Sequence, residues 1–317
     1  MHWDCSTSDD EAWPDVETQA ATAQAVLNAR PFDRVIVVLP DPESAWGLIA
    51  ACCERHLPLV LFFQLCSEDF AVPHGVGDLL RSSHSQGHVV FVSVCREAVP
   101  RLARGLGVGD ADIRTIRNAS GQSWGFTTTA ITARARSTAS ERGGTMLSVG
   151  RVSVQKGYPV LVRAALTVIK VRPDARFVWV GDGEELHVLR GLVHSSGLSR
   201  CFELAGWRDD IGSLLGSADV FVHPAVWEGT PLAISEAMAA GLPIVASCVG
   251  GIPEMLSERE AWLVQPGDSA AVSAAVIEAL GNPVLARTKG ENARARWLYE
   301  AALADSLLVA LIADRWR

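Results

Sequence analysis

Short apolar runs that alternate with helical patterns are the feature that most limits how this chain can fold. Four runs in the first half have the length of buried strands: RVIVVL (34–39), LPLVLFF (57–63), HVVFVSV (88–94) and DIRTIR (112–117). Helical patterns follow over 43–56 and 95–106, and a further helix is expected over 16–29. Strands that alternate with helices predict a parallel sheet covered by helices.

The alternation restarts more regularly after residue 144. Strands are expected at 145–150, 175–183, 201–205, 219–224, 242–247 and 261–266. Helices are expected over 157–171, 184–196, 209–217 and 231–240, with further helices to the end. This pattern describes a complete α/β domain.

The length of 317 residues suits two domains, because single hydrophobic cores stop growing at roughly 250 to 300 residues. Residues 123–144 show neither period and are rich in Thr, Ser, Ala, Arg and Gly, which is typical of a linker. We therefore expect four parts: a partial Rossmann-like domain (1–122), a linker (123–144), a second Rossmann-like domain (145–293) and terminal helices (294–317).

Composition and charge exclude several classes of function. The net charge of −8 argues against general nucleic-acid binding, which needs a basic face. No apolar run reaches the ~18 residues of a membrane helix, and the N-terminus is acidic, so a cytoplasmic protein is expected. The seven cysteines form no CxxC pair, so neither a metal site nor a cofactor is expected.

A first candidate site lies in SVGRVSVQKG (148–157), at the end of an expected strand. In open α/β sheets, ligands lie at the carboxyl ends of strands. Gly150 allows a sharp turn, and Arg151 and Lys156 are two cations that could bind a diphosphate. A pair of solvated surface cations is the alternative.

A second and more specific candidate is HPAVWEGTPLAISEAMAAGLP (223–243). Thr230 is expected to be the N-cap of a helix, Pro231 suits the first turn, and Gly241 with Pro243 ends it. The free N–H groups at such a helix start form an anion site. Glu228 and Glu236 flank it, and they suit neutral hydroxyl groups better than phosphate. A ligand that carries both a diphosphate and many hydroxyl groups would fit these residues, and a nucleotide sugar is such a ligand.

Five ordered motifs resemble the GT-B-fold retaining glycosyltransferases of family 4, the group 1 glycosyl transferases. They are GR…KG (150–157), VGDGEE (180–185), GWRD (206–209), ADVFVHPAVWEGTPLAISEAMAAGLPIVAS (218–247) and VGGIPE (249–254). The resemblance covers roughly residues 145–280 and includes the Glu-x7-Glu spacing. It implies two Rossmann-like domains whose parallel sheets face a cleft, with 294–317 crossing back to the N-terminal domain.

The resemblance also implies roles. Arg151 and Lys156 would stabilise the leaving diphosphate without a metal, Glu228 would contact the donor sugar, and Glu236 would hold the ribose. The donor-binding residues it implies are Gly150, Arg151, Lys156, Gly181, Asp182, Gly206, Trp207, Glu228, Gly229, Thr230, Pro231, Leu232 and Glu236. His223 ends a strand beside this site and is expected to pack or to support it.

The N-terminal half departs from the family, because an opening strand with a Gly-rich loop is absent and RVIVVL matches a middle strand. The first sheet is then incomplete, and its exposed edge could be covered by a protein partner or a membrane surface. Gln64 also stands where the family commonly has a histidine.

The expected function is therefore retaining, metal-independent sugar transfer from a nucleotide-diphosphate sugar to an unidentified saccharide, lipid or small molecule. One alternative is a non-catalytic or partner-dependent subunit that binds a nucleotide sugar. A second is a nucleotide-sugar epimerase, although no clear set of acid and base groups marks residues 30–120.

Overall fold

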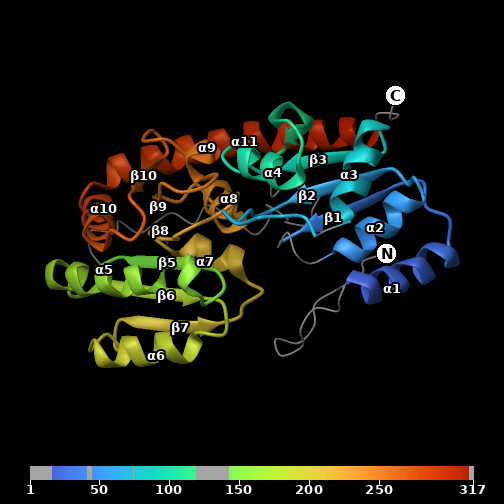
Figure 1. Cartoon of the computed structure of the whole chain (residues 1–317). Coiled ribbons are helices and arrows are strands. Elements are labelled where there is room, and N and C mark those ends of the chain that lie inside the picture. The colour runs from blue at the N-terminus through green and yellow to red at the C-terminus, as the bar shows by residue number, and fades with distance from the viewer. Residues whose placement is uncertain (1–15, 41–44, 74, 119–142, 314–317) are drawn as a thin grey trace. The chain divides into compact units, whose positions relative to one another are not determined.

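The computed structural model describes residues 16–40, 45–73, 75–118 and 143–313, so the expected linker, apart from its last two residues, lies outside the described residues. The chain divides into two compact units, one of residues 1–117 with 311–317 and one of residues 118–310. Each unit is built on a parallel β-sheet with helices packed against it (Figure 1). The prediction of an α/β fold with two parallel sheets is therefore confirmed.

The first unit has a four-stranded sheet in the order β1-β2-β3-β4, and every pair is parallel. The strands are β1 (Val35–Leu39), β2 (Leu59–Phe63), β3 (Val89–Ser93) and β4 (Ile113–Thr115). The helices are α1 (Val16–Ala29), α2 (Trp46–Glu54), α3 (Val76–Ser85) and α4 (Val99–Leu106). All four strands confirm the sequence expectation, whereas α3 was not expected because polar residues dominate its sequence.

The two faces of this first sheet differ in how well they are covered. Alternate residues such as Leu61 and Phe91 are buried in one core with α1, α2, α3 and α4. On the opposite face, Val60, Val92 and Ile116 form a smaller cluster with Leu311 near the chain end. Ile36 and Val38 of the edge strand β1 remain 44% and 50% exposed.

The second unit has a six-stranded parallel sheet in the order β10-β9-β8-β5-β6-β7. Its strands are β5 (Thr145–Val149), β6 (Arg176–Val180), β7 (Phe202–Gly206), β8 (Val220–His223), β9 (Ile244–Ser247) and β10 (Ala261–Val264). Its helices are α5 (Tyr158–Val171), α6 (Leu186–Ser195), α7 (Ile211–Ser217), α8 (Leu232–Ala239), α9 (Ile252–Met255), α10 (Ser269–Gly281) and α11 (Pro283–Ala313). Each expected strand is present, and the short helix α9 replaces what the sequence indicated as a turn.

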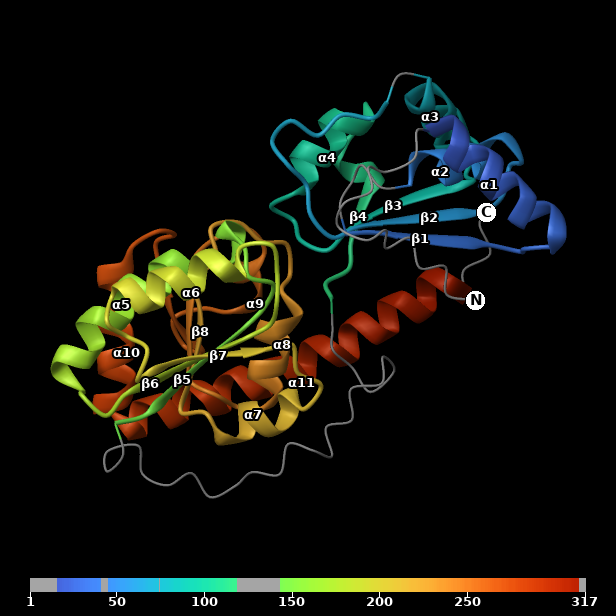
Figure 2. The same cartoon turned by 90° about the horizontal axis from the view of Figure 1, so that it is seen from below.

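Helices cover both faces of the second sheet (Figure 2). Residues of α5, α6 and α10 form one buried cluster with the sheet, and residues of α7, α8, α9 and α11 form another. This double burial explains why its strands are almost continuously apolar.

The second sheet contains a topological switch point between β5 and β8. The chain leaves β5 to pair with β6 on one side, and it returns later to place β8 on the other side. The helices that follow β5 and β8 therefore pack on opposite faces of the sheet, and in open α/β sheets ligands bind at the carboxyl ends of the strands beside such a switch point.

The last described helix, α11, is one continuous element of 31 residues, where the sequence indicated several helices. Its residues up to Ala310 belong to the second unit, and Leu311 belongs to the first. No single helix among the described residues has the length and apolar content of a membrane span; only the consecutive pair 269–281 and 283–311, bent by 105°, meets these criteria together.

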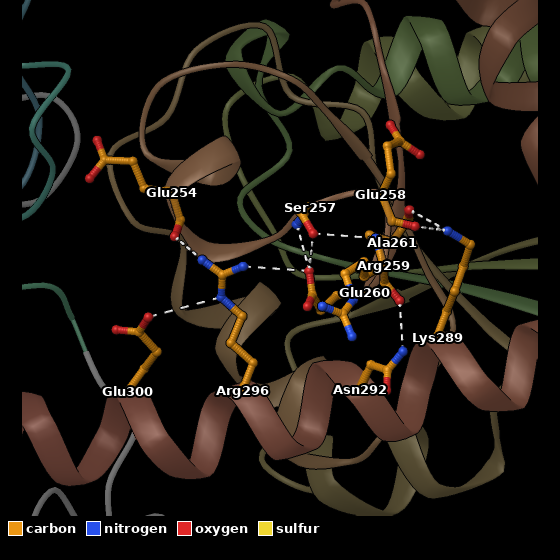
Figure 3. A network of polar contacts seen from close by, with 10 residues as sticks. All are labelled: Glu254, Ser257, Glu258, Arg259, Glu260, Ala261, Lys289, Asn292, Arg296 and Glu300. Carbon is orange, nitrogen blue, oxygen red and sulfur yellow. Dashed lines mark hydrogen bonds and ion pairs between the residues drawn. The ribbon is translucent and has the colours of Figure 1, made fainter.

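Two cations fasten α11 to the segment that leads into β10 (Figure 3). Lys289 is buried and donates hydrogen bonds from Nζ to the carbonyl oxygens of Glu258 and Ala261, the latter at 3.0 Å. Arg296 donates from Nη2 to the carbonyl oxygen of Glu254 at 2.7 Å and forms an ion pair with Glu260 at 3.4 Å. Side chains of α11 thus bind backbone carbonyl groups of α9, of the segment that follows it and of β10.

We predict that Lys289→Met lowers the free energy of unfolding by about 2 kcal/mol, because one buried and one partly buried carbonyl oxygen lose their charged donor. The ammonium also lies 5.0 Å from the Trp262 ring centroid, and this contact is lost as well. Denaturant unfolding measures the loss. The matched control is Lys170→Met on the exposed end of α5, which should change stability by less than about 0.5 kcal/mol. Equal effects of the two substitutions would contradict the role of Lys289.

Candidate functional site

The loop after β5 carries the first group of predicted residues. The Gly150 N–H donates to the Val180 carbonyl at 2.9 Å, which binds the loop start to the end of β6. Arg151 is exposed, and within the described ranges its side chain has no ion-pair partner. The chain then forms a 3-10 turn over Val154–Lys156 and enters α5 through Gly157.

Gly157 is required by a close approach of two loops. Its φ of +74° is left-handed, and a Cβ there would lie 1.9 Å from the carbonyl oxygen of Pro224, beyond β8. Gln155 adds two hydrogen bonds across the same gap, accepting from the Val226 N–H at 2.8 Å and donating to the Trp227 carbonyl at 3.2 Å. The β5 and β8 loops are therefore held together through their backbones.

The predicted residues after β6 and β7 lie beside the β5 loop. Gly181 donates to the Gly206 carbonyl at 2.8 Å, and the Asp182 carbonyl accepts from the Val152 N–H at 2.8 Å. Trp207 follows β7 directly, and 75% of its surface is exposed. An indole this exposed contributes little to the core, so it is available to a ligand.

The loop after β8 leads into α8 with a different cap from the one expected. Pro231 occupies the N-cap position and α8 begins at Leu232, so the prediction of Thr230 as N-cap is wrong by one residue. Pro231 has no N–H, so the first free amides of the helix belong to Leu232 and the residue after it. The helix start still faces the carboxyl ends of the strands, as the sequence indicated.

Three side chains meet at the switch point. Lys156 Nζ lies 2.5 Å from Glu228 Oε1, and His223 Nε2 lies 2.9 Å from the same oxygen. The side chains of Glu228 and His223 are only 5% and 4% exposed, whereas that of Lys156 is 20% exposed. Both donors act on Oε1, so Oε2 has no side-chain or backbone partner in the described parts of the chain.

The environment of Glu228 favours its ionised form. Burial alone would raise the pKa of its carboxyl group, but the hydrogen bond and charge of His223, together with Lys156, outweigh burial and lower the pKa below its ordinary value. A buried carboxylate therefore keeps its negative charge beside the Lys156 ammonium and the His223 imidazole.

Glu236 shows what happens to a carboxyl group in this region without such partners. It lies half-buried on α8, and burial raises its pKa from 4.5 to about 7. No hydrogen bond or ion pair reaches its side chain from the residues that the structure describes. Glu236 is therefore poised to accept hydrogen bonds from a ligand.

The structure thus brings most of the predicted residues to the carboxyl ends of the strands of the second sheet, and Lys156 contacts Glu228 directly. The side chains of Glu236 and Trp207 contact none of the other predicted side chains by hydrogen bond or ion pair within the described ranges. Sequence analysis gave His223 no defined contact and did not identify Gln155. The signal for His223 was its position as a polar residue at the end of a buried strand.

An open groove of about 520 Å³ runs along α6 and β7, away from the switch point. Its lining residues are His187, Arg190, Gly191, Val193, His194, Ser199, Phe202 and Leu204, none of which is a predicted site residue. No group of three or more His, Cys, Asp or Glu side chains among the described residues could hold a metal ion.

Strand order and switch point define the class of the second unit: an open α/β domain, a class whose ligands bind at the carboxyl ends of the strands. Residues 143–282 match the family model described as glycosyl transferases group 1. This match lies within the second unit and agrees with the resemblance carried by the five motifs.

A curated relative supports the same assignment. It is the UDP-Gal:alpha-D-GlcNAc-diphosphoundecaprenol alpha-1,3-galactosyltransferase of Escherichia coli, which is 36% identical over 141 residues, or 43% of this chain and 36% of that enzyme. The first five curated relatives are each matched over only 24% to 36% of their own length.

Similarity to solved structures extends over both units. A glycosyltransferase from Rickettsia africae has a TM-score of 0.73 at 17% identity, covering 98% of this chain and 85% of that one. Anabaena HepE, solved in complex with UDP and glucose, has a TM-score of 0.73 at 18% identity, covering 97% of this chain and 85% of that one. These similarities show that the chain has the GT-B fold, as predicted.

We predict that Glu236→Gln raises stability most at alkaline pH. The folded-state pKa of about 7 lies above the ordinary 4.5, so the wild type loses stability as pH rises from about 4.5 through 7, while Gln does not titrate. The variant should gain about 1 to 3 kcal/mol over the wild type between pH 5 and pH 8 in denaturant unfolding. The exposed Glu278→Gln on α10 is the control, and a difference for Glu236→Gln that does not vary with pH would refute the prediction.

Proposed function

We propose that this chain is a retaining glycosyltransferase that uses a nucleotide-diphosphate sugar and requires no metal ion. The observation that carries the proposal is the meeting of Lys156, His223 and Glu228 at the switch point of the second sheet, next to the exposed Arg151. The match of residues 143–282 to the glycosyl transferases group 1 supports glycosyl transfer as the general activity.

Two cations and a helix start serve the diphosphate. The exposed guanidinium of Arg151 can bind two phosphate oxygens at once, and Lys156 supplies a point charge from the same loop. The amide of Leu232 at the start of α8 adds a donor and the positive end of the helix dipole. These groups stabilise the negative charge that develops as the diphosphate leaves, the role that a metal ion takes in other enzymes.

Glu228 is suited to the sugar. Its Oε1 accepts hydrogen bonds from Lys156 and His223, while Oε2 remains able to accept one from a sugar hydroxyl group. Gly229 is fixed beside it, because its carbonyl accepts from the Gly251 N–H at 2.9 Å. Backbone groups at Gly229, Thr230 and Pro231 then line the sugar and phosphate.

The remaining predicted residues suit the nucleoside. Glu236 can accept the two ribose hydroxyl groups, and Gly181, Asp182, Gly206 and the exposed Trp207 flank the base. Uracil is the first base to test, because HepE was solved with UDP and with UDP-glucose, and the name of the E. coli relative specifies UDP-Gal.

The proposed reaction exchanges one bond at the anomeric carbon of the sugar. The bond to the diphosphate oxygen breaks, the acceptor hydroxyl oxygen bonds to that carbon on the same face, and the leaving diphosphate takes the hydroxyl proton. This route needs no basic side chain, which agrees with Gln64, since an amide cannot act as a base at neutral pH. The acceptor is a saccharide, a lipid or a small molecule.

We predict that Arg151→Ala weakens donor binding at least 10-fold, because a charged hydrogen bond contributes about 1.5 to 3 kcal/mol. Calorimetric titration with UDP-, GDP-, ADP- and dTDP-sugars measures the effect. The control is Arg163→Ala on α5, which removes an equal charge from an exposed helix surface and should leave the affinity unchanged. If the folded wild-type protein binds none of these nucleotide sugars, the proposed function is wrong.

A second candidate function is that of a donor-binding subunit that needs a partner. It is favoured by the open edge of the first sheet, where β1 pairs only with β2 in the described part of the chain and exposes Ile36 and Val38. Unpaired apolar strand edges bind other strands. In this case a protein partner, or a membrane surface, covers the edge before transfer occurs.

For this second candidate, we predict that Val38→Lys reduces concentration-dependent self-association of the purified chain, since a charge on an edge strand opposes strand addition. Sedimentation velocity across a concentration series measures association. The matched control is Leu166→Lys, an exposed apolar position on α5. A wild-type chain that stays monomeric and transfers sugar unaided would contradict the partner-dependent candidate.

A further inference from the structure

His223 is a buried polar group whose contact with Glu228 the proposed chemistry does not yet explain. It is the last residue of β8, and its ring stacks on Phe221 with centroids 6.2 Å apart and an interplanar angle of 13°. This packing fixes the ring direction from the core side. Its Nε2 then faces a carboxylate, which can only accept, so Nε2 carries the proton and donates it.

The two partners of Glu228 differ in how firmly each is held. His223 sits at the end of a central strand with a side chain that is almost inaccessible to solvent. Lys156 reaches Glu228 from a 3-10 turn on a long flexible stem, and its side chain is partly accessible. Of the two, Lys156 can turn toward a ligand while His223 stays in place.

The comparison between the two glutamates shows why the remaining partner matters. Glu236, without partners, has its pKa raised by burial to about 7, whereas the more deeply buried Glu228 has its pKa lowered. Glu228 therefore does not stay ionised through contact with solvent. It stays ionised because His223 and Lys156 donate hydrogen bonds to its carboxylate. Among the described residues, the titratable groups that face its carboxylate are His223 on β8 and Lys156 after β5.

We infer that His223 is a positioning residue: its Nε2–H holds the Glu228 carboxylate in place and keeps it charged when Lys156 moves from Glu228 to the diphosphate. The inference rests on the proposed function for the movement of Lys156. The hydrogen bond between His223 and Glu228 is already present without a nucleotide sugar, so it can be tested in the protein alone.

The test compares two substitutions that both remove the imidazole ring. His223→Gln retains an amide N–H that can donate to Glu228, and His223→Leu has a similar size but no donor. We expect the melting temperature of His223→Leu to fall several degrees below that of His223→Gln at pH 8, because the ionised Glu228 has lost a donor. The difference should shrink toward pH 5, where Glu228 becomes protonated in the Leu variant.

The same pair in a Glu228→Gln background separates positioning from packing. If His223 acts through the carboxylate, the pH-dependent difference disappears there. A difference that is equal at every pH, or that persists in the Glu228→Gln background, would show that His223 only fills space and would overturn the inference.

Measurements of nucleotide-sugar affinity complete the experiment. His223→Leu should weaken nucleotide-sugar affinity at least 10-fold at pH 6 and less at pH 8, while His223→Gln stays within about threefold of the wild type. Equal affinities of the two variants at both pH values would overturn the inference. If the wild type binds no donor, the proposed function fails, and the melting-temperature comparison still decides the role of His223.

Discussion

The arrangement of the second unit depends on how closely backbone segments approach one another at the carboxyl ends of its strands. Gly157 faces the Pro224 carbonyl, and a Cβ on Gly250 would lie 1.8 Å from the carbonyl oxygen of Glu228. Both glycines have positive φ, so a side chain at either position would strain the backbone and displace a neighbouring loop. The approach at Gly157 brings the β5 and β8 loops close enough for Lys156 to reach Glu228, and the approach at Gly250 holds the Glu228 loop in place.

The same contacts connect the site to α11. Gly250 and Gly251 hold the Glu228 loop, and α9 follows them directly. Arg296 of α11 then binds the Glu254 carbonyl at the end of that segment. A continuous set of backbone contacts and one cation therefore joins the longest helix of the chain to the charged cluster at the switch point.

The strands and the positions of the motif residues could be predicted from sequence, because periodicity and glycine position are local signals. All the strands were located, since buried parallel strands are short apolar runs, and the motif residues were assigned to the ends of those strands. Helix α3 was not expected, because its sequence VGDLLRSSHS is largely polar and only its buried side, with Val76 and Leu80, contacts the core. The contact of His223 with Glu228 depends on the path of the loop between them, which no local pattern specifies. The cap of α8 differs by one residue because Pro231 adopts an extended ψ of 124° that keeps it outside the helix.

The assignment of Leu311 to the first unit has a consequence for biosynthesis. Residues 118–310 form a continuous stretch of chain, so the second unit contains all its own strands and helices once that stretch has left the ribosome. The first unit is synthesised earlier, but the cluster on its second face includes Leu311 together with Val60, Val92 and Ile116. The apolar surface of this face is therefore completed only after residue 311 has been made. The main core of the first unit, by contrast, uses no residue beyond Ile113, so only its second face depends on chain made after the second unit.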